Sequence, residues 1–162
     1  MLTEGWRWYP DARATVLGLA SIYKRPPSTV AGIMAALSQR RQWRANVRDT
    51  ETMLRGGPVG GLVQARAKAA QIADGRPPDL VLRGPKIRAF YRALLGDDEA
   101  VVIDTWMLRA LGHHEKPTPK QYKRLAQRVR REARRRGIPP AVWQAIVWCK
   151  ARGSGEWPGK HS

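Results

Sequence analysis

The sequence contains one cysteine, Cys149, in 162 residues. A lone cysteine cannot form a disulfide within the chain, and it cannot build a cysteine-ligated zinc or iron–sulfur site. The three histidines do not replace it, because His113 and His114 are neighbours whose side chains point apart, and His161 stands alone. We therefore expect no metal site and no other cofactor.

Long apolar runs are also missing from the sequence. The first residues mix charged and aromatic side chains, so neither a signal peptide nor a membrane-spanning segment is expected. The basic stretches carry few large apolar residues, which argues against a membrane surface as partner. We expect a soluble protein in the cytoplasm.

Acidic residues are scarce, with 13 Asp and Glu against 30 Lys and Arg, and the formal charge is +17. A fold does not need this excess, since repulsion among like charges destabilises the compact state. A polyanionic partner explains it, and DNA is the expected one. The alternative is a generally cationic surface without a binding role, because Arg is used in preference to Lys throughout the chain.

Ten of the cations fall within residues 116–136, together with a single acid, Glu132. Like charges four residues apart destabilise an isolated helix, so this ratio indicates contact with a nucleic-acid backbone. Such contacts position a protein on its partner and do not read the base sequence. The expected backbone contacts in this stretch are Lys120, Lys123, Arg124, Arg128, Arg131 and Arg135.

Apolar residues recur at helical spacing, and period-two alternation is almost absent, which predicts an all-α fold. We expect one helical domain over residues 1–151 and a flexible tail over residues 152–162. Residues 74–85 are expected to form a loop, and residues 101–103 an extended lead-in to a helix. Helices are expected to begin near Asp11, Ser28, Arg41, Pro58, Pro85, Asp104, Pro117 and Pro140.

The chemistry is expected within residues 82–111, where a Gly-Pro-Lys turn precedes one helix and Asp104 begins another. Gly84 lets backbone amides approach a phosphate, and a helix N-terminus favours anions. Lys86 and Asp104 would then lie at neighbouring helix starts, which suits an amine nucleophile beside a carboxylate. The alternatives are a lysine that binds phosphate and an aspartate that only caps its helix.

These residues resemble the helix-hairpin-helix DNA glycosylase superfamily. There, a glycine-rich hairpin turn precedes a catalytic aspartate in a motif of the type Val-Asp-Thr-His-Val-x-Arg. Asp104, Thr105 and Arg109 match this motif in register, Trp106 replaces the histidine, and a Pro-rich loop replaces the hairpin. The segment Ala-Leu-Ser-Gln at residues 36–39, followed by Asn-Val at 46–47, resembles the region of the superfamily that lies near the flipped base.

The chain is more closely similar to small phage-encoded relatives of that superfamily. The similarity rests on Trp-Tyr-Pro at residues 8–10, Trp43, Phe-Tyr at residues 90–91, and a late Gln-Ala-x-x-Trp motif at residues 144–148 followed by Arg152. Some relatives look like enzymes that build hypermodified thymines by replacing a pyrophosphate on the thymine methylene with an amine or amino acid.

The resemblance implies a compact, monomeric, multi-helix glycosylase-like enzyme, in the host cytoplasm if phage-encoded. It would bind duplex DNA with a flipped base, or single-stranded DNA, and act on a modified pyrimidine with Lys86 and Asp104. The alternatives are a thymine-hypermodifying transferase with an amine or amino-acid co-substrate, a non-catalytic DNA-binding accessory protein, and an RNA-binding protein.

Further site residues follow from this resemblance. If these residues do not line a base pocket, the aromatic ones are expected to be core residues and the polar ones to be solvated. The implied base-pocket residues are Trp8, Tyr9, Gln39, Trp43, Asn46, Tyr91 and Trp106. The implied backbone contacts outside residues 116–136 are Arg83, Gly84, Arg88 and Arg109.

Overall fold

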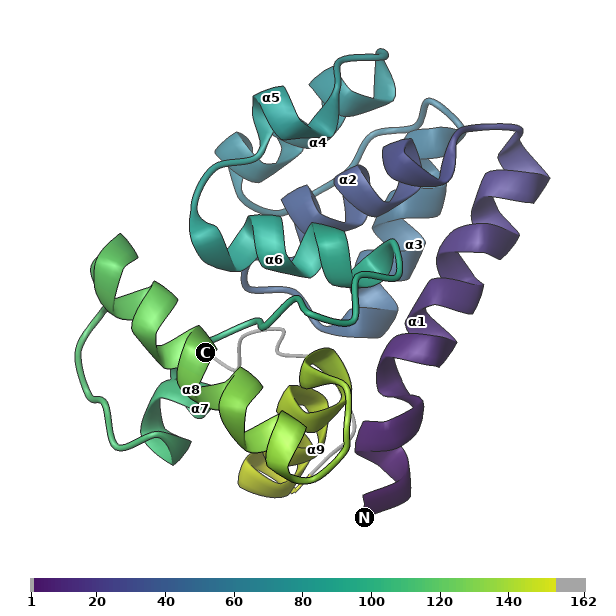
Figure 1. The fold of residues 1–162 in the computed structure, drawn as a ribbon. Coiled ribbons are helices and arrows are strands. Elements are labelled where there is room, and N and C mark those ends of the chain that lie inside the picture. Colours follow the sequence, from purple (N-terminus) through teal and green to yellow (C-terminus); the bar gives the residue numbers. More distant parts are fainter. Residues whose placement is uncertain (1, 154–162) are drawn as a thin grey trace. The chain divides into compact units, whose positions relative to one another are not determined.

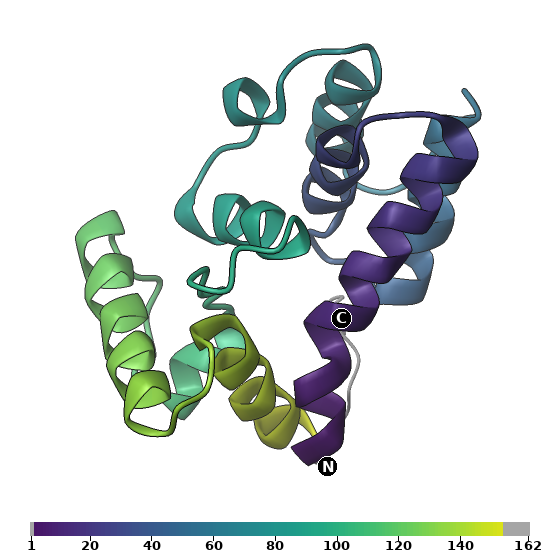
Figure 2. The ribbon, with the colours of Figure 1, turned by 45° about the vertical axis from the view of Figure 1, so that its right-hand side comes forward.

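The computed structural model describes residues 2–153, and within this range the chain is all-helical, as predicted (Figures 1 and 2). The described residues form two compact units: unit 1 holds residues 2–13 and 84–153, and unit 2 holds residues 14–83. The helices are α1 (Leu2–Tyr23), α2 (Pro27–Leu37), α3 (Trp43–Leu54), α4 (Val63–Ala73), α5 (Pro78–Val81), α6 (Pro85–Leu94), α7 (Thr105–Ala110), α8 (Pro119–Arg135) and α9 (Pro140–Arg152).

The start of α1 differs from the prediction. The helix begins at Leu2 and not near Asp11, and Pro10 lies inside it. A proline within a helix removes a backbone hydrogen bond and costs about 3 kcal/mol. Burial of the two preceding aromatic residues offsets this cost at about 2 kcal/mol each, because Trp8 is 7% and Tyr9 0% exposed.

Three further boundaries in unit 2 differ from the prediction. Ser28 lies inside α2, whose N-cap is Pro26. α4 begins at Val63 and not at Pro58, because the intervening residues include Gly61 with a φ of 96°, which no α-helix accommodates. The expected loop over residues 74–85 contains the one-turn helix α5, which begins with a proline and buries Val81.

Unit 2 is built around α2, which packs against α3, α4 and α5. Every residue of α2 from Val30 to Leu37 is buried. Gly32 is required there, since a Cβ atom at this position would lie 2.7 Å from the ring of Pro78. Pro78, one of the prolines that suggested a loop in the sequence, thus packs directly on the central helix of this unit.

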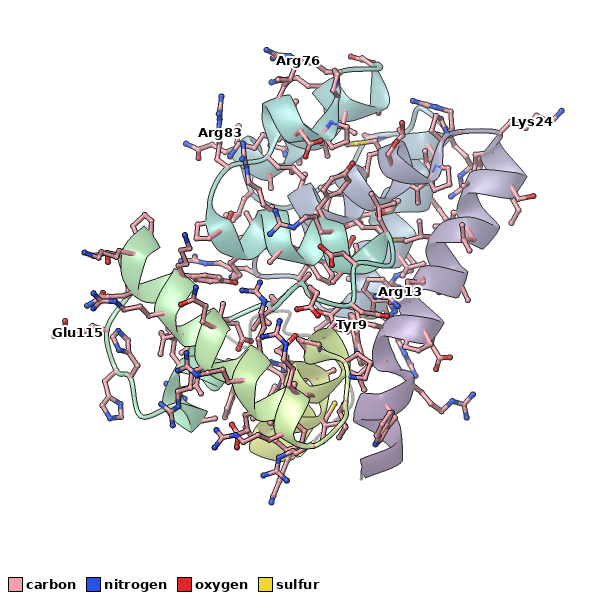
Figure 3. The ribbon with its side chains drawn as sticks, viewed as in Figure 1. Tyr9, Arg13, Lys24, Arg76, Arg83 and Glu115 are labelled. Carbon is pink, nitrogen blue, oxygen red and sulfur yellow. The ribbon has the colours of Figure 1, made fainter. Side chains whose placement is uncertain are left out.

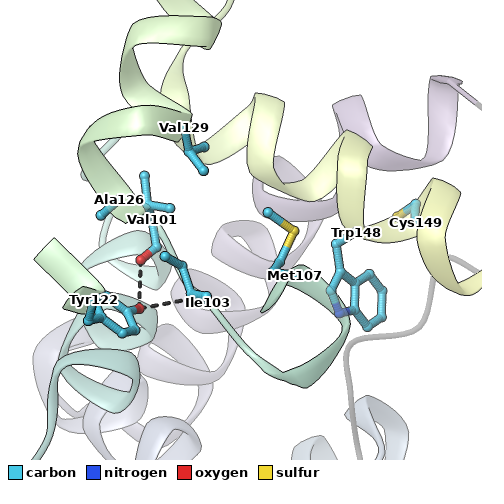
Figure 4. Packing of buried hydrophobic residues seen from close by; sticks show 8 residues of the cluster. All are labelled: Val101, Ile103, Met107, Tyr122, Ala126, Val129, Trp148 and Cys149. Carbon is cyan, nitrogen blue, oxygen red and sulfur yellow. Dashed lines mark hydrogen bonds between the residues drawn. The ribbon is translucent and has the colours of Figure 1, made fainter. Parts of the chain in front are cut away.

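The core of unit 1 lies between α7, α8 and α9 (Figure 4). Residues 101–103 are extended and buried, as predicted, without a neighbouring strand among the described residues. Tyr122 of α8 takes the place of a strand: its hydroxyl donates to the carbonyl of Val101 at 2.8 Å and accepts from the amide of Ile103 at 2.9 Å. This pair of bonds fixes the segment that leads into α7.

The end of α9 lies close to the predicted domain boundary. Arg152 is the last helical residue, and Gly153 follows in the left-handed conformation with a φ of 72°, as is common after a helix. The remaining residues of the expected tail, 154–162, lie outside the described range.

Candidate functional site

Asp104 is buried at the start of α7, with 7% of its surface exposed. Its Oδ1 accepts a hydrogen bond from the amide of Met107 at 2.9 Å, so the predicted helix cap is confirmed. Its Oδ2 accepts a second bond from the indole nitrogen of Trp148 at 2.8 Å. Each carboxylate oxygen therefore has an N–H donor, and the side chain is held in one orientation.

Trp148 belongs to a row of three side chains on α9. Gln144, Trp148 and Arg152 are four residues apart and so lie on one face of the helix. Gln144 is fully buried, and its Oε1 accepts from the hydroxyl of Tyr9 at 3.3 Å. This face of α9 thus connects the Trp-Tyr-Pro segment of α1 with Asp104.

Two guanidinium groups lie against Trp106. Those of Arg109 and Arg152 are 5.3 and 5.7 Å from its ring centroid, and Arg152 is also 5.1 Å from the ring of Trp148. Distances below about 6 Å are typical of attractive cation–π contacts. The aromatic residue that replaces the histidine of the motif is therefore half-buried among cations of its own unit.

Lys86 lies in the first turn of α6 and is exposed. No hydrogen bond or ion pair joins it to Asp104 within residues 2–153. A lysine becomes nucleophilic when it is desolvated or placed beside a cation, and Lys86 is not desolvated. Its position suits an anion contact better than a nucleophile.

Gly84 is the N-cap of α6, with a φ of 86° and a ψ of 150°, and no atom lies within 4 Å of a Cβ built there. The backbone before α6 is therefore open, as an approach to a phosphate requires. Arg83 and Arg88 are exposed on either side of this turn, and Figure 3 shows Arg83 directed away from the helices.

Three of the implied base-pocket aromatics of unit 1, namely Trp8, Tyr9 and Tyr91, are core residues. Trp8 and Tyr9 pack edge to face with ring centroids 4.9 Å apart, and Trp8 lies 6.2 Å from Phe90. Tyr91 is 6% exposed. Burial raises the pKa of Tyr9, and the negative charge of Asp104 raises it further, so Tyr9 is a neutral hydrogen-bond donor at neutral pH.

The remaining base-pocket residues, Gln39, Trp43 and Asn46, lie in unit 2, whereas Lys86 and Asp104 lie in unit 1. Gln39 is exposed and Trp43 is half-buried. Asn46 is buried: its Nδ2 donates to the carbonyl of Met34 at 2.9 Å, and its Oδ1 accepts from Thr50 at 3.2 Å. The bond to Met34 joins α3 to α2, the bond from Thr50 lies within α3, and together they account for a polar residue on that face.

The cations of α8 and its C-cap fall into two groups. The first group is bound to the fold. Arg128 donates to the carbonyl of Leu111 at 3.0 Å, and Arg130 donates to the carbonyl of Glu99 at 2.9 Å. Arg134 lies 3.4 Å from the Glu99 carboxylate, and Arg136 lies 3.6 Å from Glu132 and 4.3 Å from the ring centroid of Trp143.

The second group is exposed and has no hydrogen bond or ion pair to any residue that the structure describes. At 100° per residue, four of its members lie within about 60° of one another around the helix axis. They lie opposite the buried residues Tyr122, Ala126, Val129 and Ala133. The whole group, here called the α8 cationic face, comprises Lys120, Lys123, Arg124, Arg131 and Arg135.

Residues 1–155 match a family described as a family of unknown function (DUF7178). The chain belongs to this family. No curated protein and no solved structure matches it. The DUF7178 match includes Asp104, the row on α9 and the whole of α8. Within the described residues, no helix is long and apolar enough to cross a membrane, and no three His, Cys, Asp or Glu side chains are grouped to hold a metal ion.

Several interactions of this DUF7178 chain were not predicted. The bond between Trp148 and Asp104 joins residues 44 positions apart, and no sequence pattern specifies it. The four-residue spacing of Gln144, Trp148 and Arg152 was the one signal in the sequence for their shared face. The involvement of Glu99 with α8 had no signal in the sequence.

Proposed function

We propose that this protein binds DNA, with the α8 cationic face lying along the phosphate backbone. Among residues 2–153, the α8 cations separate into a group bound to the fold and a group without partners, and this observation carries the proposal. Cations that served only the fold would be expected to pair with acids or carbonyls, as Arg128, Arg130, Arg134 and Arg136 do. The partnerless group instead remains accessible to an external polyanion.

The dimensions of α8 suit this role. Lys120 and Arg135 are 15 residues apart, which corresponds to about 22 Å along the helix axis. Duplex DNA carries one charge per about 1.7 Å of its axis, so a face of this length meets several phosphates. The face consists of cations, so binding through it is expected to depend on salt and only weakly on base sequence.

Fluorescence anisotropy of a labelled 20-base-pair duplex, measured at several salt concentrations, tests this proposal. Lys120→Ala and Arg135→Ala, combined, should weaken binding and reduce the slope of log K against log salt by about 0.9 for each phosphate that is no longer neutralised. Lys150→Ala combined with Arg7→Ala, both exposed in unit 1 outside α8, controls for net charge. Equally weakened binding in the two variants would contradict the proposal, and preferential competition by structured RNA would assign the surface to RNA.

We further propose, as the glycosylase resemblance implies, that the protein acts on a DNA base with Asp104. The supporting observation is a buried carboxylate held by two N–H donors, since a fixed charge needs no reorganisation during a reaction. Asp104 would stabilise positive charge developing on the sugar or base. Lys86, being exposed, would anchor a phosphate; the alternative is that it attacks the anomeric carbon.

Borohydride trapping on DNA with damaged or 5-substituted pyrimidines separates the reactions. A covalent adduct that Lys86→Ala abolishes indicates a lyase with Lys86 as nucleophile. Release of a free base without an adduct indicates a glycosylase that uses water. A mass change in the intact nucleoside, dependent on an added amine or amino acid, indicates the thymine-modifying transferase. If Asp104→Asn leaves every DNA-dependent activity unchanged, the protein is a non-catalytic DNA-binding protein.

A further inference from the structure

A surface hollow of about 500 Å³ lies on α8 and is lined by Gln127, Arg130, Arg131 and Arg134. These residues follow the spacing i, i+3, i+4 and i+7, so they share one face of the helix. Gln127 and Arg131 are exposed and have no hydrogen bond or ion pair among the described residues. Within residues 2–153, the hollow therefore presents one guanidinium and one amide without a partner, beside two further guanidinium groups.

Glu99 holds those two guanidinium groups in place. Its backbone carbonyl accepts from Arg130 at 2.9 Å, and its carboxylate lies 3.9 Å from Arg130 and 3.4 Å from Arg134. The backbone of Glu99 is itself held, because its amide donates to the side chain of Asp97 at 3.0 Å. The turn before residues 101–103 thus orients one wall of the hollow.

The charges at the hollow do not cancel. Three arginines contribute +3 and Glu99 contributes −1, which leaves a formal charge of +2. Guanidinium groups bind phosphate through two parallel N–H donors, and this geometry gives more specificity than an ammonium group gives. Arg131 is available to donate two such hydrogen bonds to a phosphate. Arg130 and Arg134, which Glu99 orients, form the opposite wall of the hollow.

We infer that this hollow is a fixed binding site for a phosphoryl group, with Arg131 as its bidentate ligand. The phosphodiester of DNA is one source of that group, and this source rests on the DNA-binding function proposed above. A free phosphate or nucleotide is the other source. The site differs from the remainder of the α8 cationic face in that geometry, and not charge alone, determines its affinity.

Two pairs of substitutions test geometry against charge by DNA anisotropy. Arg131→Lys keeps the charge and should weaken binding about tenfold, since a hydrogen bond to a charged group contributes about 1.5 kcal/mol. Arg124→Lys, made on the same helix outside the hollow, should change binding less than about twofold, because a phosphate contact that depends on charge alone is kept. Glu99→Gln should strengthen binding beyond the effect of Glu115→Gln, an exposed site with the same change in charge. It removes a carboxylate that competes with phosphate for Arg134, while the backbone carbonyl of residue 99 still orients Arg130.

The Glu99 variant also distinguishes a binding site from a structural ion pair. If the ion pair only supports the fold, Glu99→Gln should strengthen DNA binding no more than Glu115→Gln does, because the two variants change the net charge equally. The proposed site predicts a larger gain for Glu99→Gln, because this variant frees a guanidinium group, and a loss for Arg134→Ala, which removes it. If the Arg131→Lys and Arg124→Lys variants both bind DNA as tightly as the wild type, the inference is wrong, while the DNA-binding proposal stands.

Inorganic phosphate distinguishes the two sources. The melting temperature of the full chain is measured in phosphate and in sodium chloride of equal ionic strength, since a ligand of the native state raises Tm. If Tm is higher in phosphate, if Arg131→Ala abolishes this increase, and if the protein does not bind DNA, the phosphoryl site is supported and the DNA-binding proposal is refuted. No rise and no DNA binding would refute both.

Discussion

The indole nitrogen of Trp148 lies 2.8 Å from Oδ2 of Asp104 and donates a hydrogen bond to it inside unit 1. This bond connects the middle of α9 to the N-cap residue of α7. Together with the bond from Met107, it gives each carboxylate oxygen a donor, and a buried charge is stable only when it is hydrogen-bonded in this way. The stability of unit 1 should therefore depend on this pair.

We expect Trp148→Phe to lower the free energy of unfolding by about 1 to 3 kcal/mol, because a charged acceptor loses its buried donor. Urea unfolding at pH 7 measures the loss. Trp143→Phe is the matched control, since Trp143 is half-buried on the same helix and contacts Arg136 instead of a carboxylate. Equal losses in the two variants would show that only aromatic volume matters.

A double-mutant cycle isolates the bond itself. Asp104→Asn places an amide donor against either Met107 or Trp148, so this single variant should also be destabilised. In the Trp148→Phe background the same substitution should cost less, with a coupling energy of about 0.5 to 3 kcal/mol. Strictly additive losses would indicate that the two side chains do not interact in solution.

Tyr122 makes the stability of the protein sensitive to alkaline pH. Burial raises the pKa of its hydroxyl to about 12, from the usual value near 10. The unfolded chain ionises first, so this contribution is complete below pH 10 and is lost as the pH rises from 10 to 12. Unfolding experiments across this range should show a loss of about 2 to 3 kcal/mol that Tyr122→Phe removes.

The Tyr122→Phe variant has a second expected effect, at pH 7. It loses the bonds to Val101 and Ile103 and should be destabilised by about 1 to 3 kcal/mol. Tyr9 also has a raised pKa, so some alkaline sensitivity should remain in this variant. An identical pH dependence in the wild type and the variant would contradict the assignment to Tyr122.

Charge reversal on α8 should separate binding from stability. Arg124→Glu places an acid four residues from both Lys120 and Arg128, where opposite charges stabilise a helix by about 0.2 to 0.5 kcal/mol per pair. We expect the free energy of unfolding to be unchanged or slightly higher at low salt, and DNA affinity to fall. Anisotropy and urea unfolding on the same preparation measure both quantities.

Arg128→Ala is the counterpart of that variant. Arg128 donates to the carbonyl of Leu111, the C-cap of α7, so its loss should cost about 1 kcal/mol of stability. A larger loss of stability in Arg124→Glu than in Arg128→Ala would contradict the division of the α8 cations into two groups.

Gly84 should tolerate no side chain despite the open space around it. Its φ of 86° and ψ of 150° fall in a region that is essentially restricted to glycine, so Gly84→Ala should cost about 1 to 3 kcal/mol. Gly153→Ala, at a φ of 72° and a ψ of 14°, should cost less, because other residues sometimes adopt that left-handed conformation. The midpoints of urea unfolding rank the two variants.

The sequence by itself determined those features that depend on a few neighbouring residues. Asp104 caps α7, Thr118 and Gln121 form a reciprocal cap for α8, and Pro140 begins α9. The same short-range pattern specified the buried stripe of α8 and its opposite cationic side. Caps, prolines and helical periodicity act over a single turn, so they are visible without a fold.

Tertiary structure decided the rest. Helix α1 continues through Pro10 because Trp8 and Tyr9 are buried, and the hydroxyl of Tyr122 takes the place of a partner strand for the extended residues 101–103. Asp104 meets Trp148 only because α9 packs on α7. Burial and long-range hydrogen bonds provide several kcal/mol at each of these points, which exceeds the local preferences that the sequence displays. Which cations of α8 find a partner among the described residues likewise depends on where Glu99 and Leu111 come to lie, and no local pattern specifies that.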